Sequence, residues 1–193
     1  MLQQKSRSPS IWKNTNRGVL QSAPRFWQTW LADTGSLTAK LEQQLNHKLS
    51  VQVLVDRNQN VLKNERHFFK RPLRRCRVRE VLLSADQTPL VLARSIIPVS
   101  SASGSNQFVL KLGRRPLGAV LFARKKGKKH YNEREMICLK QSHPLWQSCK
   151  KKYPLLPNKL WARRTLYQLK NHPLLVNEIF LPTLEAKLKE LER

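Results

Sequence analysis

Short apolar segments separated by turn residues run through most of the chain, and their order constrains the fold more than any other feature. Residues 49–55 (LSVQVLV) alternate apolar and polar side chains, which is the pattern of a half-buried strand. Residues 75–84 and 90–97 read as two further strands, and the turn residues 85–89 (ADQTP) between them predict a hairpin. Because consecutive strands joined by tight turns pair antiparallel, this order argues against a doubly wound parallel sheet.

Later segments complete the predicted sheet and the helices around it. Three more strands are predicted at residues 116–123, 159–169 and 174–181. Helices are predicted in three places where apolar residues fall at helical spacing: after Pro24, after the capping residue Ser36, and near the C-terminus in LEAKLKELER. We therefore expect an α+β fold, with a single domain built on about six antiparallel strands with flanking helices.

The regular pattern covers residues 22–193, which we expect to form one domain. Residues 1–21 are polar and basic and read as a loose N-terminal tail. Residues 124–158 hold basic runs and three prolines without a sustained period, and we interpret them as a basic insert within the domain.

The chain is strongly basic, with 37 Lys and Arg against 12 Asp and Glu and a net charge of +25. The basic residues cluster in residues 66–79, which hold seven Lys and Arg, in residues 124–129, which hold five, and in residues 150–152. Such clusters attract phosphates, or they are a solvated basic surface, or some of their arginines bind a small anionic substrate. No zinc-finger, RNP aromatic, KH or heptad signature accompanies the charge, so we expect no specific nucleic-acid partner.

Several classes of protein and site are disfavoured. No apolar run approaches the roughly 18 residues that cross a bilayer, and the N-terminus lacks the apolar region of a secretory signal, so we expect a cytoplasmic protein without a membrane span. Cys76, Cys138 and Cys149 form no CxxC pair and the histidines form no HxxxH or HxH pair, so we predict neither disulfides nor a metal site. No Ser-His-Asp order or Gly-x-Ser-x-Gly elbow supports nucleophilic hydrolysis.

Charged residues within apolar strands are the best candidates for chemistry, because a buried charge requires a partner. Glu178 lies in LLVNEIFLP and shares a strand face with Val176 and Phe180, unless that face is turned to solvent. Arg79 and Glu80 alternate in RVREVLL, so one of them is expected to point toward a core or a cavity. A buried Arg79 implies an anionic partner, either a ligand or a carboxylate of the protein in a purely structural pair.

Six sequence blocks occur in a fixed order along the chain. They are DTGSLTAKL (33–41), VREVLLSAD (78–86), ARSIIPVS (93–100), KLGRRPLGAVLF (111–122), LWARR (160–164) and PLLVNEIFLP (173–182). Each block alone is weakly specific, whereas six in this order are much more specific, and together they resemble the chorismate lyase (chorismate pyruvate-lyase) family. The chain departs from the family pattern in its N-terminal tail, its basic surface, the insert and the C-terminal extension.

The resemblance implies an antiparallel sheet with flanking helices that enclose a ligand site. It further implies a lyase that converts chorismate to 4-hydroxybenzoate and pyruvate, the first step of ubiquinone biosynthesis in many bacteria, without a metal or an organic cofactor. The partner that it implies is the small-molecule substrate, and we expect the chain to act as a monomer.

The family's ligand contacts, carried over to this chain, fall on four residues. The resemblance implies that Arg79 binds a carboxylate of the substrate, a task that suits the paired donors of a guanidinium. It implies that Glu178 accepts a hydrogen bond from the ring hydroxyl or, alternatively, transfers a proton. Leu117 is expected to contact the substrate through its backbone, and Leu37 through its side chain, where the family often has Met. Arg79 and Glu178 are thus the expected catalytic residues.

Two other classes of function stay open. The fold also resembles the ligand-sensing domains of some transcription regulators, which are normally fused to a DNA-binding helix-turn-helix, and no such segment precedes residue 22. The charge alone would also fit a basic nucleic-acid-associated protein, and salt-sensitive retention on DNA without chorismate turnover would favour that function.

Overall fold

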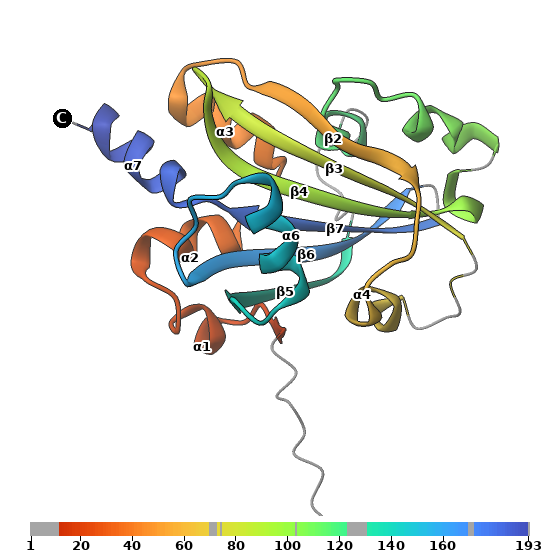
Figure 1. Cartoon of the computed structure of the whole chain (residues 1–193), viewed down its shortest axis with the longest axis horizontal. Coiled ribbons are helices and arrows are strands. Elements are labelled where there is room, and N and C mark those ends of the chain that lie inside the picture. Colours follow the sequence, from red (N-terminus) through yellow and green to blue (C-terminus); the bar gives the residue numbers. More distant parts are fainter. Residues whose placement is uncertain are drawn as a thin grey trace, which may run out of the picture.

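The structure, a computed structural model, describes residues 12–69, 73, 75–102, 104–122, 131–169 and 172–192. These residues form one open antiparallel sheet of seven strands in the order β1-β5-β6-β7-β4-β3-β2, with helices packed against it (Figure 1). The strands are β1 (Lys13–Asn14), β2 (Ser50–Asn58), β3 (Cys76–Ala85), β4 (Thr88–Pro98), β5 (Tyr131–Lys140), β6 (Lys159–Leu169) and β7 (His172–Phe180). The predicted α+β class and antiparallel pairing are confirmed, with seven strands in place of about six.

Helices connect and flank the strands. They are α1 (Arg17–Leu20), α2 (Arg25–Ala32), α3 (Leu37–Leu45), α4 (Lys63–Phe68), α5 (Leu117–Leu121), α6 (Pro144–Lys152) and α7 (Pro182–Leu191), together with the 3-10 helices η1 (Val99–Ala102) and η2 (Gly104–Leu110). Ser36 caps α3 as predicted, since its hydroxyl oxygen accepts a hydrogen bond from the backbone N–H of Ala39. Pro24 directly precedes α2, where its missing N–H removes no helical hydrogen bond.

The predicted hairpin joins β3 to β4 through Asp86 and Gln87. Both residues have positive φ angles, 45° and 67°, and this backbone matches the twist of the two strands that the turn connects. Along β3 successive side chains point to opposite sides of the sheet, so Arg79 and Glu80 lie on different faces.

Different helices cover the two faces of the sheet. The face of Arg79, here called the pocket face, is covered by α2, α3, α5 and α7. The apolar core between these helices and the sheet includes Trp27, Trp30, Leu41, Phe180 and Leu184. The face of Glu80, here called the network face, is covered by α4 and α6, and its apolar core includes Leu92, Ile137, Trp146, Cys149 and Ile179. Each face therefore has its own buried interior.

The strand expected at residues 116–123 is wrong, because residues 117–121 form α5. Leu117 and Leu121 are four residues apart, so both side chains fall on one side of the helix and both are buried. A short apolar run bounded by Pro fits a strand and a helix equally well by composition, and tertiary packing decides between them here.

Parts of the expected insert and of the expected tail form regular elements. Residues 131–152 supply β5 and α6, and β5 lies between β1 and β6, so this part of the expected insert belongs to the sheet and its cover. Trp12, within the expected loose tail, is buried and packs edge-on against His143, and β1 and α1 follow it. Residues 1–11 of the expected tail and residues 123–130 of the basic segment lie outside the described residues.

Candidate active site

A cavity lies on the pocket face, between the sheet and the helices α3 and α5. All four residues carried over from the sequence resemblance line it: Leu37, Arg79, Leu117 and Glu178. Apolar side chains of the sheet, among them Val81, Leu83, Ala93 and Val176, also line it. Its volume is about 50 Å³.

Arg79 is nearly inaccessible to solvent, with 2% of its surface exposed. One Nη1 hydrogen is donated to Asp56 Oδ2 of β2 at 3.1 Å, which gives the buried guanidinium a counter-charge. Nη2 donates to the backbone carbonyl oxygens of Gly113 at 2.7 Å and Arg115 at 3.3 Å. These bonds occupy at most three of the five N–H donors, so at least two make no bond to a described residue.

The carbonyls that bind Arg79 belong to the loop that leads into α5. Gly113 has a φ of 55°, a left-handed backbone that glycine adopts without steric cost, and this conformation helps to direct its carbonyl oxygen. Because Leu117 begins α5 four residues later, the hydrogen bonds of Arg79 also fix the wall of the cavity that faces it.

Glu178 is paired with a second buried arginine. Its Oε2 accepts a hydrogen bond from Nε of Arg163, the neighbouring residue across β6 and β7. Arg163 is fully buried, and its Nη1 also donates to the backbone carbonyl oxygens of Trp30 and Asp33, each at 2.6 Å. Burial acts to lower the pKa of Arg163, but the charge of Glu178 and the hydrogen bond to it outweigh burial and raise that pKa.

Two further polar side chains line the cavity and were not predicted from the sequence. Ser95 lies opposite Arg79 in the register of β3 and β4. Tyr167 is buried, and burial together with the nearby charge of Glu178 raises the pKa of its phenol, which therefore stays protonated and can donate a hydrogen bond. Tyr167 is four residues after Arg163 in β6, and that even spacing could have placed both on the face of Glu178.

Glu80 is buried on the network face, so both charges of the Arg79–Glu80 pair are inside the protein. Its Oε1 accepts a hydrogen bond from Nη1 of Arg94 at 2.7 Å, and its Oε2 forms an ion pair with Lys152. Arg94 also donates from Nε and Nη2 to both oxygens of Glu65, at 2.8 and 3.0 Å. Glu80 therefore belongs to a structural ion pair within the protein, and the arginine of that pair is Arg94.

The part of the chain that the structure describes contains no group of three or more His, Cys, Asp or Glu side chains arranged to hold a metal ion. Cys76, Cys138 and Cys149 are free thiols. His143 serves a local structural purpose, since its Nδ1 accepts a hydrogen bond from the backbone N–H of Leu145 at the start of α6. No helix among the described residues is long and apolar enough to cross a membrane.

The fold and the cavity together define an α+β protein with an internal site suited to a small anionic ligand. The chain belongs to the chorismate lyase family, whose model matches residues 7–189.

Several named proteins are similar to this chain. The "Probable chorismate pyruvate-lyase" of Aromatoleum aromaticum is 39% identical over 167 residues, which cover 83% of this chain and 87% of that protein. The protein of the same name from Methylococcus capsulatus is 33% identical over 156 residues, covering 80% and 94%. The "Chorismate pyruvate-lyase" of Hamiltonella defensa is 32% identical over 163 residues, covering 79% and 76%. Among solved structures, a GntR-family transcriptional regulator from Enterococcus faecalis has a TM-score of 0.47 at 13% identity, over 70% of this chain and 90% of that one.

Proposed function

We propose that this chain is a chorismate pyruvate-lyase, which eliminates pyruvate from chorismate to give 4-hydroxybenzoate for ubiquinone biosynthesis. The observation that carries the proposal is that Arg79 and Glu178, which come from different strands, line one cavity in a member of the chorismate lyase family. The names of the relatives at 32–39% identity support the same reaction. We assign the catalytic domain to the chain from Trp12 onward, since β1 and buried Trp12 pack with the rest.

The charges of the cavity suit the substrate. Chorismate is a dianion, with one carboxylate on the ring and one on the enolpyruvyl group. Arg79 binds one carboxylate with the N–H donors that the protein leaves unused, and the backbone N–H of Leu117 supports the same anion. Glu178 accepts a hydrogen bond from the ring hydroxyl, and the side chain of Leu37 contacts the ring from the opposite wall.

The reaction is an elimination in which no net oxidation occurs. The bond between the ring carbon and the enolpyruvyl oxygen breaks, and its electron pair leaves with that oxygen. A ring C–H proton is lost, its electron pair completes the aromatic ring, and the departing enolpyruvate takes up a proton and becomes pyruvate. Because aromaticity supplies the driving force, holding a reactive conformer in a dry cavity and stabilising the departing charge suffice, and no metal or organic cofactor is required.

Arg163 bears on the role of Glu178. Oε2 of Glu178 already accepts a hydrogen bond from Arg163, which leaves Oε1 to accept a hydrogen bond from the substrate. Tyr167, kept protonated by burial and by Glu178, is positioned in the cavity to donate a hydrogen bond to an oxygen of the substrate.

The proposal is tested with the purified full chain and chorismate in buffer that contains a chelator. We expect stoichiometric release of 4-hydroxybenzoate and pyruvate, followed by absorbance and by a coupled lactate dehydrogenase assay. Turnover that disappears when metal is removed would contradict the cofactor-free reaction. A chain that binds chorismate without producing 4-hydroxybenzoate would contradict the lyase itself.

A further inference from the structure

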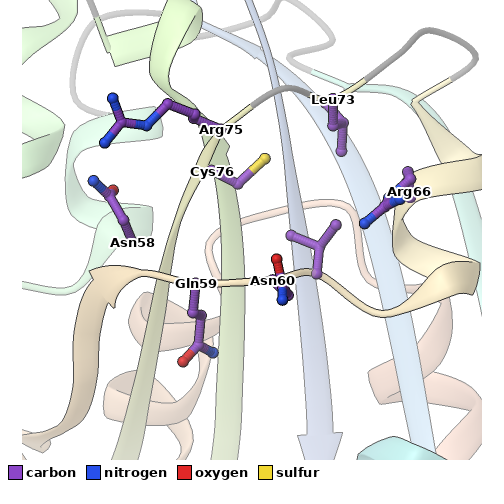
Figure 2. Close-up of a pocket in the computed structure, with 8 residues that line it drawn as sticks. Asn58, Gln59, Asn60, Arg66, Leu73, Arg75 and Cys76 are labelled. Carbon is purple, nitrogen blue, oxygen red and sulfur yellow. The ribbon is translucent and has the colours of Figure 1, made fainter.

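A second cavity lies where the end of β2, the start of β3 and α4 meet. Its volume is about 410 Å³, within the size range of ligand-binding sites, and it opens to solvent. Its polar lining consists of Asn58, Gln59, Asn60, Arg66 and Arg75, with the thiol of Cys76 beside them (Figure 2). It shares no lining residue with the cavity that holds Arg79 and Glu178.

The two arginines of this cavity lack counter-charges. In the part of the chain that the structure describes, neither Arg66 nor Arg75 forms an ion pair or a side-chain hydrogen bond, and the described lining contains no Asp or Glu. Arg77 and Arg79, from the same basic segment, differ because both pair with Asp56. Glu65, the neighbour of Arg66, is fully buried and bound to Arg94.

Two exposed and unpaired guanidinium groups in a polar hollow attract anions. Arg66 comes from α4 and Arg75 precedes β3, and they lie on separate sides of the cavity (Figure 2). A ligand with several acidic groups spaced along it can contact both arginines at once. The net charge of +25 adds a long-range field that raises the local concentration of a polyanion.

The side chains of the lining favour some classes of polyanion over others. The apolar side chains of the described lining are Val61 and Leu73, which are half-buried. Neither is among the exposed large apolar side chains of the described residues, so the cavity has no exposed apolar anchor for a lipid surface. No aromatic side chain lies in the described lining on which a base could stack, so the affinity would come from contacts to the phosphate backbone. The amide groups of Asn58, Gln59 and Asn60 are ordinary donors to phosphate and sugar oxygens.

We propose that this cavity binds the phosphate backbone of nucleic acid, with Arg66 and Arg75 each contacting a phosphate. This function is separate from the lyase reaction and uses the part of the basic segment 66–79 that the lyase site leaves free.

The salt dependence of binding gives a quantitative expectation. Each phosphate contact on a single strand contributes about 0.7 to the slope of log affinity against log salt concentration. Removing both arginines should therefore lower the slope by about 1.4 and weaken binding by roughly tenfold at about 0.1 M salt.

The experiment measures fluorescence anisotropy of a labelled, mixed-sequence DNA strand of about twelve nucleotides over a salt series. The test variant is Arg66→Gln with Arg75→Gln. The matched control is Arg17→Gln with Arg25→Gln, which removes the same charge from exposed residues of α1 and α2. The proposal expects the loss of affinity and slope for the test variant and a change below about twofold for the control.

Equal losses in both double variants would overturn the proposal, because they would show that the charge of the whole surface binds the strand. An unchanged affinity of the test variant would overturn it as well. Phosphatidylserine vesicles provide the remaining comparison: if the test variant loses vesicle binding and keeps oligonucleotide binding, the occupant is a membrane surface and the proposal is wrong. Chorismate turnover, measured in parallel, should be normal in both variants and reports on the lyase proposal alone.

Discussion

Arg79 and Glu80 are adjacent in β3, yet they lie on opposite faces of the sheet. The two buried interiors differ in how their charged groups are hydrogen-bonded. On the network face, the carboxylate of Glu65 accepts hydrogen bonds from Arg94, from Asn177 at 3.0 Å and from the backbone N–H of Leu62 at 2.9 Å. On the pocket face, Arg79 keeps donors that no described residue uses, and Nη2 of the buried Arg163 has no hydrogen-bond partner in the described part of the chain.

This difference has an energetic meaning. Buried ions are tolerated when their hydrogen bonds are complete, and an unsatisfied buried group costs about 1–3 kcal/mol. The charged groups of the network face are thus paired with one another, although Oδ1 of Asn177 accepts no hydrogen bond in the described part of the chain. The pocket face instead leaves N–H donors of two buried arginines available for a ligand. Substitutions on the two faces should separate loss of activity from loss of folding.

The largest effect is expected on the pocket face. We expect Arg79→Ala to reduce kcat/KM for chorismate by roughly a thousandfold, about 4 kcal/mol, because the substrate dianion loses its buried counter-charge. The matched control is Arg77→Ala, which removes the other arginine bound to Asp56 but does not line the cavity, and should change kcat/KM by only a few fold. Near-normal conversion by Arg79→Ala would defeat the assignment.

The next effect lies on the network face. Glu65→Gln leaves Arg94 buried with an incomplete set of partners, and we expect a loss of about 3 kcal/mol in the free energy of unfolding, measured by urea denaturation. Glu185→Gln removes a more exposed pair with Lys189 one helical turn away and should cost less than about 0.5 kcal/mol. Folded Glu65→Gln should retain its kcat. If kcat falls while stability holds, the two faces are not separate in the way described.

A sharper comparison comes from the carboxylate of the pocket. Glu178→Gln should still bind 4-hydroxybenzoate in calorimetry while its kcat falls by about a hundredfold, close to 3 kcal/mol, because the charge that Arg163 balances is gone. Turnover at the wild-type rate would rule out a role in proton transfer and leave Glu178 a binding residue only.

The smallest effect concerns the response of the network face to pH. Burial, and then the charge of Arg164, lower the pKa of His143 to about 4 from 6.5. The unfolded chain binds this proton more readily, so neutral His143 contributes its full stability above pH 6.5 and loses it as pH falls toward 4. Unscreened, this change in pKa would correspond to about 3.4 kcal/mol, and screening by solvent lowers the expected contribution to about 2 kcal/mol.

Between pH 6.5 and 4, we expect the unfolding free energy of the wild type to fall by about that much more than the unfolding free energy of His143→Asn. The reason is that Asn can cap α6 but does not titrate. Urea denaturation at several pH values measures the difference between the two proteins, in which the titration of other groups cancels. Parallel curves for the variant and the wild type would contradict the buried, neutral histidine.

Most of the strands, and the residues that line the pocket, could be predicted from the sequence. Strand periodicity placed Arg79 and Glu80 on opposite faces, and the ordered blocks pointed to Leu37, Leu117 and Glu178, which the structure brings to one cavity. These inferences succeed because they depend on local alternation or on contiguous motifs.

The partners of those residues could not be predicted in the same way. Asp56 reaches Arg79 because the pairing of β2 with β3 shifts between Val53 and Val55, an irregularity that alternation along β2 does not reveal. Glu65 lies in α4, within a stretch without a clear period, and meets Arg94 only after α4 packs on the sheet. Long-range register and helix placement decide both contacts.

Arg163 has a consequence for the way the protein is synthesised. Its hydrogen bond to the carbonyl oxygen of Trp30 joins residues 133 positions apart. During translation, α2 therefore cannot form this contact until β6 has been synthesised. Until the C-terminal strands leave the ribosome, Trp27 and Trp30 also lack Phe180 of β7, the ring that both of them contact. A nascent or prematurely terminated chain that stops before β6 should therefore present Trp27 and Trp30 to chaperones, and it should have no partially active form.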